Sequence, residues 1–134
     1  MVLADDHTET AEQLRKLLQP HFDVVAVVKD GRALVEVVAR LSPDVIVTDL
    51  SMPMLDGIDA SVLILRRTPA ARIVFVTVHD ESILVDRGLA AGALGYVLKD
   101  SAGDELVPAV RSALDGRQFV SRALSQEKRN TRPD

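Results

Sequence analysis

The sequence has no cysteine, no basic or long apolar leader at its N-terminus, and no apolar run near the roughly 18–20 residues that span a membrane. The absence of cysteine excludes a disulfide framework and a thiolate metal site, and a cytosolic protein needs neither. The formal net charge of −4 argues against a nucleic-acid-binding domain, which is expected to be basic. We therefore expect an acidic, soluble, cytoplasmic protein that does not associate with a membrane.

The predicted fold is organised around residues 43–57. Val45-Ile46-Val47 is wholly apolar and β-branched, which is typical of a parallel strand buried on both faces. The strand ends at Asp49, and Pro53 and Gly57 mark a following loop. Ligands bind at the carboxyl ends of strands in open parallel sheets, so Asp49 is a candidate functional residue. An ordinary solvated aspartate at a strand end is the alternative.

Strands and helices alternate along the rest of the chain. Apolar runs predict strands over residues 2–4, 23–28, 45–47, 72–78 and 94–98. Helical periodicity predicts helices over residues 7–19, 57–67, 81–91 and 104–116, and a further helix after Asp30-Gly31 with Leu34, Val37, Val38 and Leu41 at helical spacing. This pattern predicts a doubly wound α/β fold, a five-stranded parallel sheet with five helices. We adopt the flavodoxin-like strand order 2-1-3-4-5.

The C-terminal part is less regular. Ser101 and Asp104 have capping-box spacing, but Pro108 removes a backbone donor, so we expect a loose first turn or a later start of the last helix. Residues 117–134 are polar and resemble a linker or disordered tail, with four cations: Arg122, Lys128, Arg129 and Arg132. The 134 residues, 47% of them hydrophobic, therefore divide into one domain, 1–117, and a tail, 118–134.

Three aspartates are expected to converge at the carboxyl edge of this sheet. Strands 1 and 3 are neighbours in the adopted order, which brings Asp5, Asp6 and Asp49 together. Their mutual repulsion calls for a cation. Hard oxygen ligands with no histidine or cysteine nearby favour Mg²⁺. Alternatively, Asp5 and Asp6 simply cap the first helix.

Two further polar residues end the neighbouring strands. Thr77 lies at the end of the fourth strand, and Lys99 ends the fifth. Beside carboxylates and a metal ion, a hydroxyl and an ammonium group are suited to bind a phosphoryl group that is being transferred. Taken singly, Thr77 is also consistent with a plain strand residue and Lys99 with a solvated lysine.

The residues of this edge resemble a known family. The set matches the CheY-like receiver domain of two-component response regulators over roughly residues 1–117: Asp5-Asp6, Asp49 with Met52-Pro53 and Gly57, Thr77, and Tyr96 to Lys99. Ala4 to His7 and Leu98 to Ser101 resemble its NarL/FixJ branch. Two positions depart from the commonest pattern, because Asp100 replaces a frequent proline and Val78 replaces a small residue.

The resemblance implies the role of each residue. Asp49 is the expected phospho-acceptor, and Lys99 contacts the phosphoryl group. Thr77 and Tyr96 form a switch that alters the surface of the fourth helix, fifth strand and fifth helix. Mg²⁺ is held by Asp49, by Asp5 or Asp6, and by one backbone carbonyl, that of Ser51.

The resemblance also implies partners. They are a sensor histidine kinase and, in a homodimer, a second copy of the chain. DNA is expected to bind only to an output domain that these 134 residues lack. Gly116 to Ser121 resembles the start of the connection to such a domain.

Two other functions compete with that of a receiver, and one further alternative keeps the receiver but drops the DNA-binding output. An aspartyl phosphatase of the haloacid dehalogenase type needs a second aspartate where this chain has Ser51. A flavodoxin-like electron carrier needs a phosphate loop where Asp5-Asp6-His7 would repel the FMN phosphate. A stand-alone receiver acting as a relay or interaction module remains the alternative. We therefore expect no classical enzyme, although a receiver can catalyse its own phosphorylation and dephosphorylation.

Overall fold

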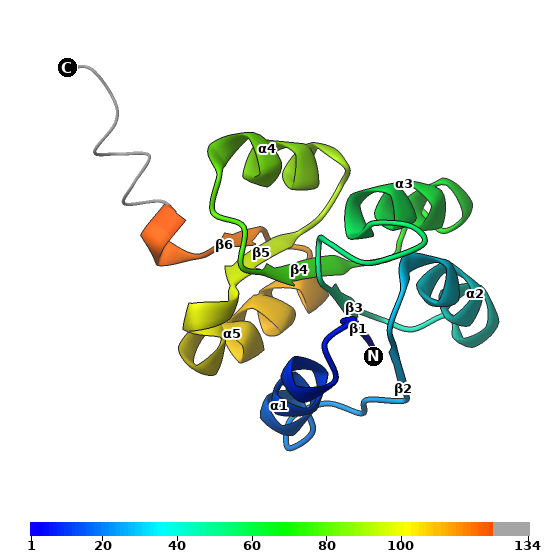
Figure 1. Cartoon of the computed structure of the whole chain (residues 1–134), viewed down its shortest axis with the longest axis horizontal. Coiled ribbons are helices and arrows are strands. Elements are labelled where there is room, and N and C mark those ends of the chain that lie inside the picture. Colours follow the sequence, from blue (N-terminus) through cyan, green and yellow to red (C-terminus); the bar gives the residue numbers. More distant parts are fainter. Residues whose placement is uncertain (125–134) are drawn as a thin grey trace.

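A computed structural model describes residues 1–124 of the chain. Six parallel strands form one sheet in the order β2-β1-β3-β4-β5-β6, with helices on both faces (Figure 1). The elements are β1 Val2–Ala4, α1 Thr8–Leu18, β2 Ala26–Val28, α2 Gly31–Leu41, β3 Ile46–Thr48, α3 Gly57–Arg67, β4 Ile73–Thr77, α4 Ser82–Ala90, β5 Gly95–Leu98, the 3-10 helix η1 Lys99–Ser101, α5 Ala102–Leu114 and β6 Phe119–Val120. Within residues 1–124, every helix is too short or too polar to cross a membrane.

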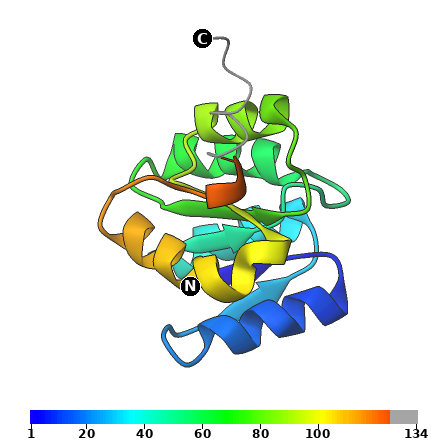
Figure 2. The same cartoon turned by 90° about the vertical axis from the view of Figure 1, so that its left-hand side faces the viewer.

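The sheet separates two hydrophobic cores. Helices α2, α3 and α4 cover one face, and α1 and α5 cover the other (Figures 1 and 2). Successive strand residues alternate between the faces, so Ile46 packs in the first core and Val47 in the second. This double burial explains why the central strands are apolar apart from the last residues of β3 and β4, Thr48 and Thr77.

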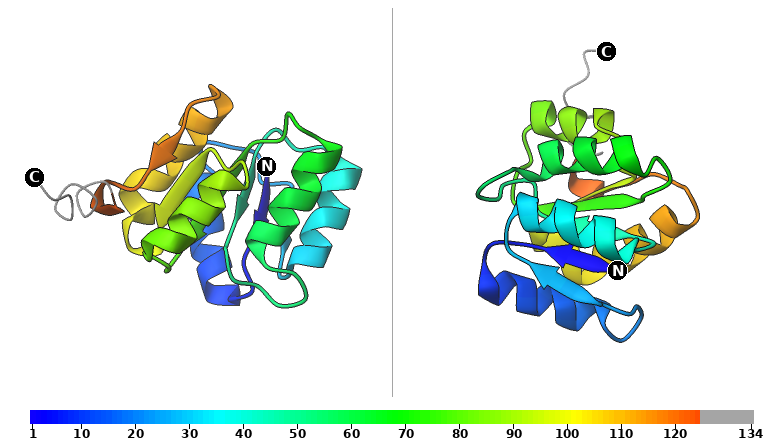
Figure 3. Two further views of the ribbon diagram at one scale, coloured as in Figure 1. Left: turned by 90° about the horizontal axis from the view of Figure 1, so that it is seen from above. Right: turned by 90° about the vertical axis from the view of Figure 1, so that its right-hand side faces the viewer.

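Capping aspartates and a glycine position helices α2 and α3. The side chains of Asp30 and Asp56 cap α2 and α3 by accepting hydrogen bonds from Ala33 N (2.7 Å) and Asp59 N (2.8 Å). Helices α2 and α3 lie side by side (Figure 3). At the start of α3, a Cβ on Gly57 would lie 2.1 Å from the carbonyl oxygen of Asp49, so only glycine fits there. The loop after Asp49 is thereby held against the end of its own strand.

The parallel α/β fold and the order of the first five strands are confirmed, but the sheet has a sixth strand. Phe119 and Val120 pair with Gly95 and Tyr96 on the outer edge of β5. Ser121 and Leu124 are buried. The expected linker or tail therefore does not begin at residue 118. The short apolar segment Phe119-Val120 does not stand out in the sequence because residues 117–134 are polar as a whole. Residues 125–134 lie outside the described part of the chain.

The expected late or loose start of the last helix is wrong. Helix α5 begins at Ala102, directly after η1, and Ser101 caps it with no side-chain hydrogen bond. Pro108 lies inside the helix and removes a donor that would face the carbonyl of Asp104. Both residues are exposed, so water can satisfy that carbonyl. The buried residues of α5 keep their packing against the sheet.

Candidate functional site

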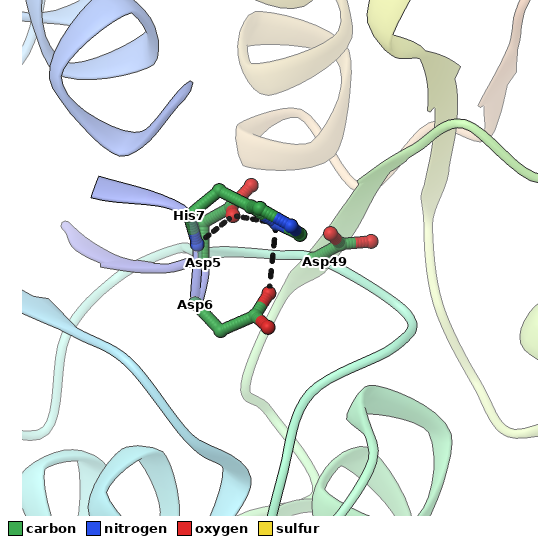
Figure 4. A group of neighbouring side chains, drawn as sticks. All are labelled: Asp5, Asp6, His7 and Asp49. Carbon is green, nitrogen blue, oxygen red and sulfur yellow. Dashed lines mark hydrogen bonds and ion pairs between the residues drawn. The ribbon is translucent and has the colours of Figure 1, made fainter. Parts of the chain in front are cut away.

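The register of the sheet brings the predicted carboxylates together. Ala4 of β1 pairs with Thr48 of β3, so the next residues, Asp5 and Asp49, leave the sheet side by side. Figure 4 shows Asp5, Asp6, His7 and Asp49 gathered at this edge. One ligand atom from each of the four lies within 4.8 Å of the others. The predicted convergence of the three aspartates is confirmed.

The expectation that no histidine lies near these carboxylates is wrong. His7 Nδ1 lies 3.1 Å from Asp6 Oδ1 and 3.6 Å from Asp5 Oδ1. The backbone N–H of His7 also donates to Asp5 Oδ1 (2.9 Å). This turn folds the ring back over the aspartates, and the ring remains 70% exposed. The position of His7 directly after Asp6 indicates in the sequence that the histidine lies close by, but it does not determine the orientation of the ring.

Lys99 bridges the two most buried aspartates. It is the first residue after β5, and its Nζ lies 2.8 Å from Asp49 Oδ2 and 2.9 Å from Asp5 Oδ2. Burial alone would lower the pKa of Lys99, but the hydrogen bonds and negative charges of Asp49 and Asp5 outweigh it and raise the pKa. The ammonium group therefore stays charged at neutral pH and neutralises part of the carboxylate charge.

The donor set fits a hard divalent cation. The buried oxygens Asp5 Oδ2 and Asp6 Oδ1 lie 2.9 Å from Lys99 Nζ and 3.1 Å from His7 Nδ1, and neither has a further partner within residues 1–124. Asp49 Oδ1 accepts the N–H of Leu50 (2.7 Å), which fixes the carboxylate. Under-satisfied carboxylate oxygens at this spacing are ligands that Mg²⁺ prefers. The contribution of the Ser51 carbonyl stays a prediction.

Thr77 and Tyr96 are both joined to His79. Thr77 is fully buried and its Oγ1 accepts the N–H of His79 (3.3 Å). Tyr96 is also fully buried and its hydroxyl donates to the carbonyl of His79 (2.8 Å). Burial, followed by the negative charges of Glu81, Asp49 and Asp80, raises the pKa of Tyr96 well above its usual value. The two predicted switch residues thus meet at one loop residue, which no pattern in the sequence indicates.

An open cavity of about 490 Å³ lies over Asp49. Ser51 Oγ and His79 Nε2 are 2.8 Å apart across its lining and share a hydrogen bond. Val78 lines the cavity and is 68% exposed. Val78 therefore lies at the cavity and not in the core.

Comparison with known proteins identifies the family. The sequence profile described as "Response regulator receiver domain" matches residues 1–111. The chain is 34% identical over 122 residues to the transcriptional regulatory protein DegU of Brevibacillus brevis, covering 90% of this chain and 52% of DegU. It therefore spans about half the length of that relative.

Solved structures agree with this assignment. A two-component response regulator of the LuxR family from Aurantimonas sp. SI85-9A1 superposes with a TM-score of 0.90, at 35% identity and with 96% of each chain covered. The isolated receiver domain of RcsB from Salmonella enterica serovar Typhimurium, with the phosphomimetic BeF3⁻, gives a TM-score of 0.85 at 30% identity, covering 93% of this chain and 94% of that one. A structure of RcsB, of which this chain covers 64%, contains two dimers bound to two parallel DNAs.

The chain belongs to the response regulator receiver domain family. Its solved relatives place it with the receivers of LuxR-family, NarL-like two-component regulators, as the resemblance to the NarL/FixJ branch predicts. The family consists of regulators rather than classical enzymes.

Proposed function

We propose that this chain receives a phosphoryl group on Asp49 from a sensor histidine kinase and uses it to switch a surface. The contact of Lys99 with Asp49 carries the proposal. It places a fixed positive charge at the carboxylate that borders the open cavity. The phosphoryl group enters from that cavity, and its oxygens meet the Lys99 ammonium.

The transfer is a displacement at phosphorus. A carboxylate oxygen of Asp49 attacks the phosphorus of a phosphohistidine or a small acyl phosphate. The new P–O bond forms as the donor's P–N or P–O bond breaks, and the leaving group keeps that electron pair. Asp49 Oδ1 is held by the N–H of Leu50, which fixes the direction of attack. Lys99 stabilises the charge on the transferred group.

The metal site serves the same group. Asp5, Asp6 and Asp49, whose ligand atoms converge at this edge, would hold Mg²⁺ together with the carbonyl of Ser51. When bound, Mg²⁺ supplies positive charge that offsets the phosphoryl oxygens. The buried oxygens Asp5 Oδ2 and Asp6 Oδ1, which have no partner beyond Lys99 and His7 within residues 1–124, support this assignment.

The phosphorylated surface controls a separate output. We propose that Thr77 moves toward the phosphoryl group and that Tyr96 follows, which alters α4, β5 and α5. In the parent protein this surface controls dimerisation and a DNA-binding domain, as the names of DegU and the DNA-bound RcsB dimers suggest. A stand-alone receiver is the second candidate, and the length of the natural reading frame decides between them.

Mass spectrometry tests the phospho-acceptor. Incubation with acetyl phosphate and Mg²⁺ is expected to add one phosphoryl mass to the wild-type chain and none to Asp49→Asn. Asp44→Asn is the matched control, because this exposed aspartate precedes the same strand at the opposite edge of the sheet. Equal labelling of Asp49→Asn and wild type, or labelling that persists after Mg²⁺ is chelated, would contradict the assignment.

A further inference from the structure

A buried carboxylate joins α5 to the segment after β6. Glu105 is 7% exposed, and its Oε1 accepts a hydrogen bond from the hydroxyl of Ser121 (2.9 Å). Its Oε2 accepts the backbone N–H of Arg122 (3.1 Å). A buried carboxylate is costly unless hydrogen bonds compensate it, so these bonds fix the position of the segment.

Ser121 also contacts the strand that carries Lys99. It is fully buried, and its Oγ accepts the backbone N–H of Leu98 (2.9 Å). Its own N–H donates to the carbonyl of Tyr96 (2.9 Å). Strand β6 ends at Val120, so the Ser121 hydroxyl supplies the acceptor that a further strand residue would otherwise give.

The hydrogen bond from the N–H of Leu98 to Ser121 Oγ lies one residue before Lys99. On one side, Leu98 pairs with Thr77 of β4, and on the other it is held by Ser121. The chain then turns into η1, whose first residue is Lys99. The direction in which Lys99 leaves the sheet therefore depends on the last anchored residue of β5.

We propose that Ser121, oriented by Glu105, is a positioning residue for Lys99. The proposal rests on the proposed role of Lys99 at the phosphoryl group. The Ser121 hydroxyl fixes the end of β5 between β4 and the segment after β6 through its hydrogen bond to Leu98. The fixed strand end keeps the Lys99 ammonium within 2.9 Å of both Asp5 and Asp49.

A purely structural role predicts a different result from a positioning role. If Ser121 only anchors the C-terminal segment, its removal lowers stability and leaves the reaction at Asp49 unchanged. If it positions Lys99, its removal slows the reaction only when Lys99 is present. A double-mutant cycle separates the two.

The experiment measures the rate of Asp49 phosphorylation by acetyl phosphate with Mg²⁺. Ser121→Ala is expected to slow it on the order of tenfold, because misplaced reacting groups lose rate steeply. In the Lys99→Ala background the same substitution is expected to have no further effect. Ser121→Thr, which keeps a hydroxyl, restores the rate. Ser112→Ala is the matched control, since that hydroxyl donates to the carbonyl of Arg117, outside this network.

Two measurements keep the test decisive. Thermal unfolding shows whether Ser121→Ala folds; if it does not, Glu105→Gln, which keeps one of the two acceptor oxygens, replaces it and is expected to cause a smaller, Lys99-dependent loss. The NMR signal of the Lys99 ammonium, recorded without any phosphoryl donor, is expected to shift in Ser121→Ala and not in Ser112→Ala. An unchanged Lys99 signal, or equal rate losses with and without Lys99, would overturn the proposal. Absent phosphorylation of the wild type would instead contradict the proposed function, and the NMR result would still stand.

Discussion

The hydroxyl of Tyr96 donates a hydrogen bond of 2.8 Å to the backbone carbonyl of His79. This bond holds the Tyr96 ring in the hydrophobic core on one face of the sheet, where it packs edge-on against Phe75. The N–H of the same histidine bonds Thr77. A movement of Thr77 therefore acts on His79, the residue whose carbonyl accepts the hydrogen bond of Tyr96.

The first prediction concerns this coupling. Adding beryllium fluoride and Mg²⁺ is expected to change amide exchange in α4 and β5 as well as around Asp49, because His79 links the two regions. Thr77→Ala is expected to confine the change to the neighbourhood of Asp49. Exchange confined there in the wild type would contradict the proposed switch.

Tyr96 gives a second prediction, for alkaline pH. It is the only tyrosine, so tyrosinate absorbance reports on it alone. Its folded pKa is raised by burial and nearby negative charge, so below the unfolded value of about 10 both states hold the proton and stability is intact. Above that pH the unfolded state releases the proton first, and the free energy of unfolding falls. The raised pKa of Lys99 acts in the same direction.

The titration is checked by following absorbance and circular dichroism together. We expect the tyrosinate signal to appear above the usual tyrosine range and to coincide with unfolding. The signal should be absent in Tyr96→Phe. Titration at the ordinary tyrosine pKa in a protein that remains folded would show that Tyr96 is accessible to solvent.

The third prediction concerns the lifetime of the phosphoryl group. Val78→Ala is expected to speed both formation and loss of the phosphorylated state by roughly two- to fivefold, equivalent to about 0.4–1 kcal/mol in each barrier, by widening access to Asp49. Ile83→Ala is the matched control, because Ile83 is equally exposed, at 68%, and lies outside the lining of the cavity. Identical half-lives for Val78→Ala and wild type would exclude this role.

The fourth prediction concerns the metal. Mg²⁺ at about 100 times its dissociation constant is expected to raise the free energy of unfolding by about 2.7 kcal/mol. Asp6→Asn should lose most of this gain because it replaces a charged carboxylate ligand with a neutral amide. His7→Asn should keep it and weaken Ni²⁺ binding instead, because nickel accepts imidazole nitrogen more readily than Mg²⁺ does. Calorimetric titration of both ions checks it, and a gain retained in Asp6→Asn would contradict the ligand set.

The fifth prediction compares two glycines. Gly57→Ala is expected to lower the free energy of unfolding by about 2–4 kcal/mol, because its Cβ would lie 2.1 Å from the Asp49 carbonyl. Gly103→Ala, in open space inside α5, is expected to raise it by about 0.5–1 kcal/mol. Urea unfolding measures both. Similar stabilities for the two variants would show that the loop after Asp49 can move away from Gly57.

The sequence predicted the features that follow from strand topology. Asp5 and Asp49 converge because each follows a buried parallel strand, and apolar runs locate those strands directly. The orientation of His7 and the bond between Tyr96 and His79 depend on side-chain torsions and tertiary packing, which periodicity does not determine. Strand β6 was missed because two residues are too few for a pattern.

Pro108 was misread for a related reason. The cost of proline in a helix depends on whether the carbonyl that loses its partner is buried. Here the outer face of α5 carries both Pro108 and Asp104, and the inner face keeps Leu106 and Ala109 in the core. The sequence indicates that proline destabilises a helix locally, but it does not show on which face of α5 Pro108 lies.

The hydrogen bond between Leu98 and Ser121 acts in both directions. Thermodynamic linkage requires that a ligand at one end of a coupled pair change affinity at the other end by the same factor. Under the proposed role of Ser121, a partner that binds the chain after Val120 and displaces Ser121 would therefore change the free energy of the phosphorylated state. A kinase would then be one input to this receiver, and the bound target would be a second one, which shifts the balance between the two states of Asp49.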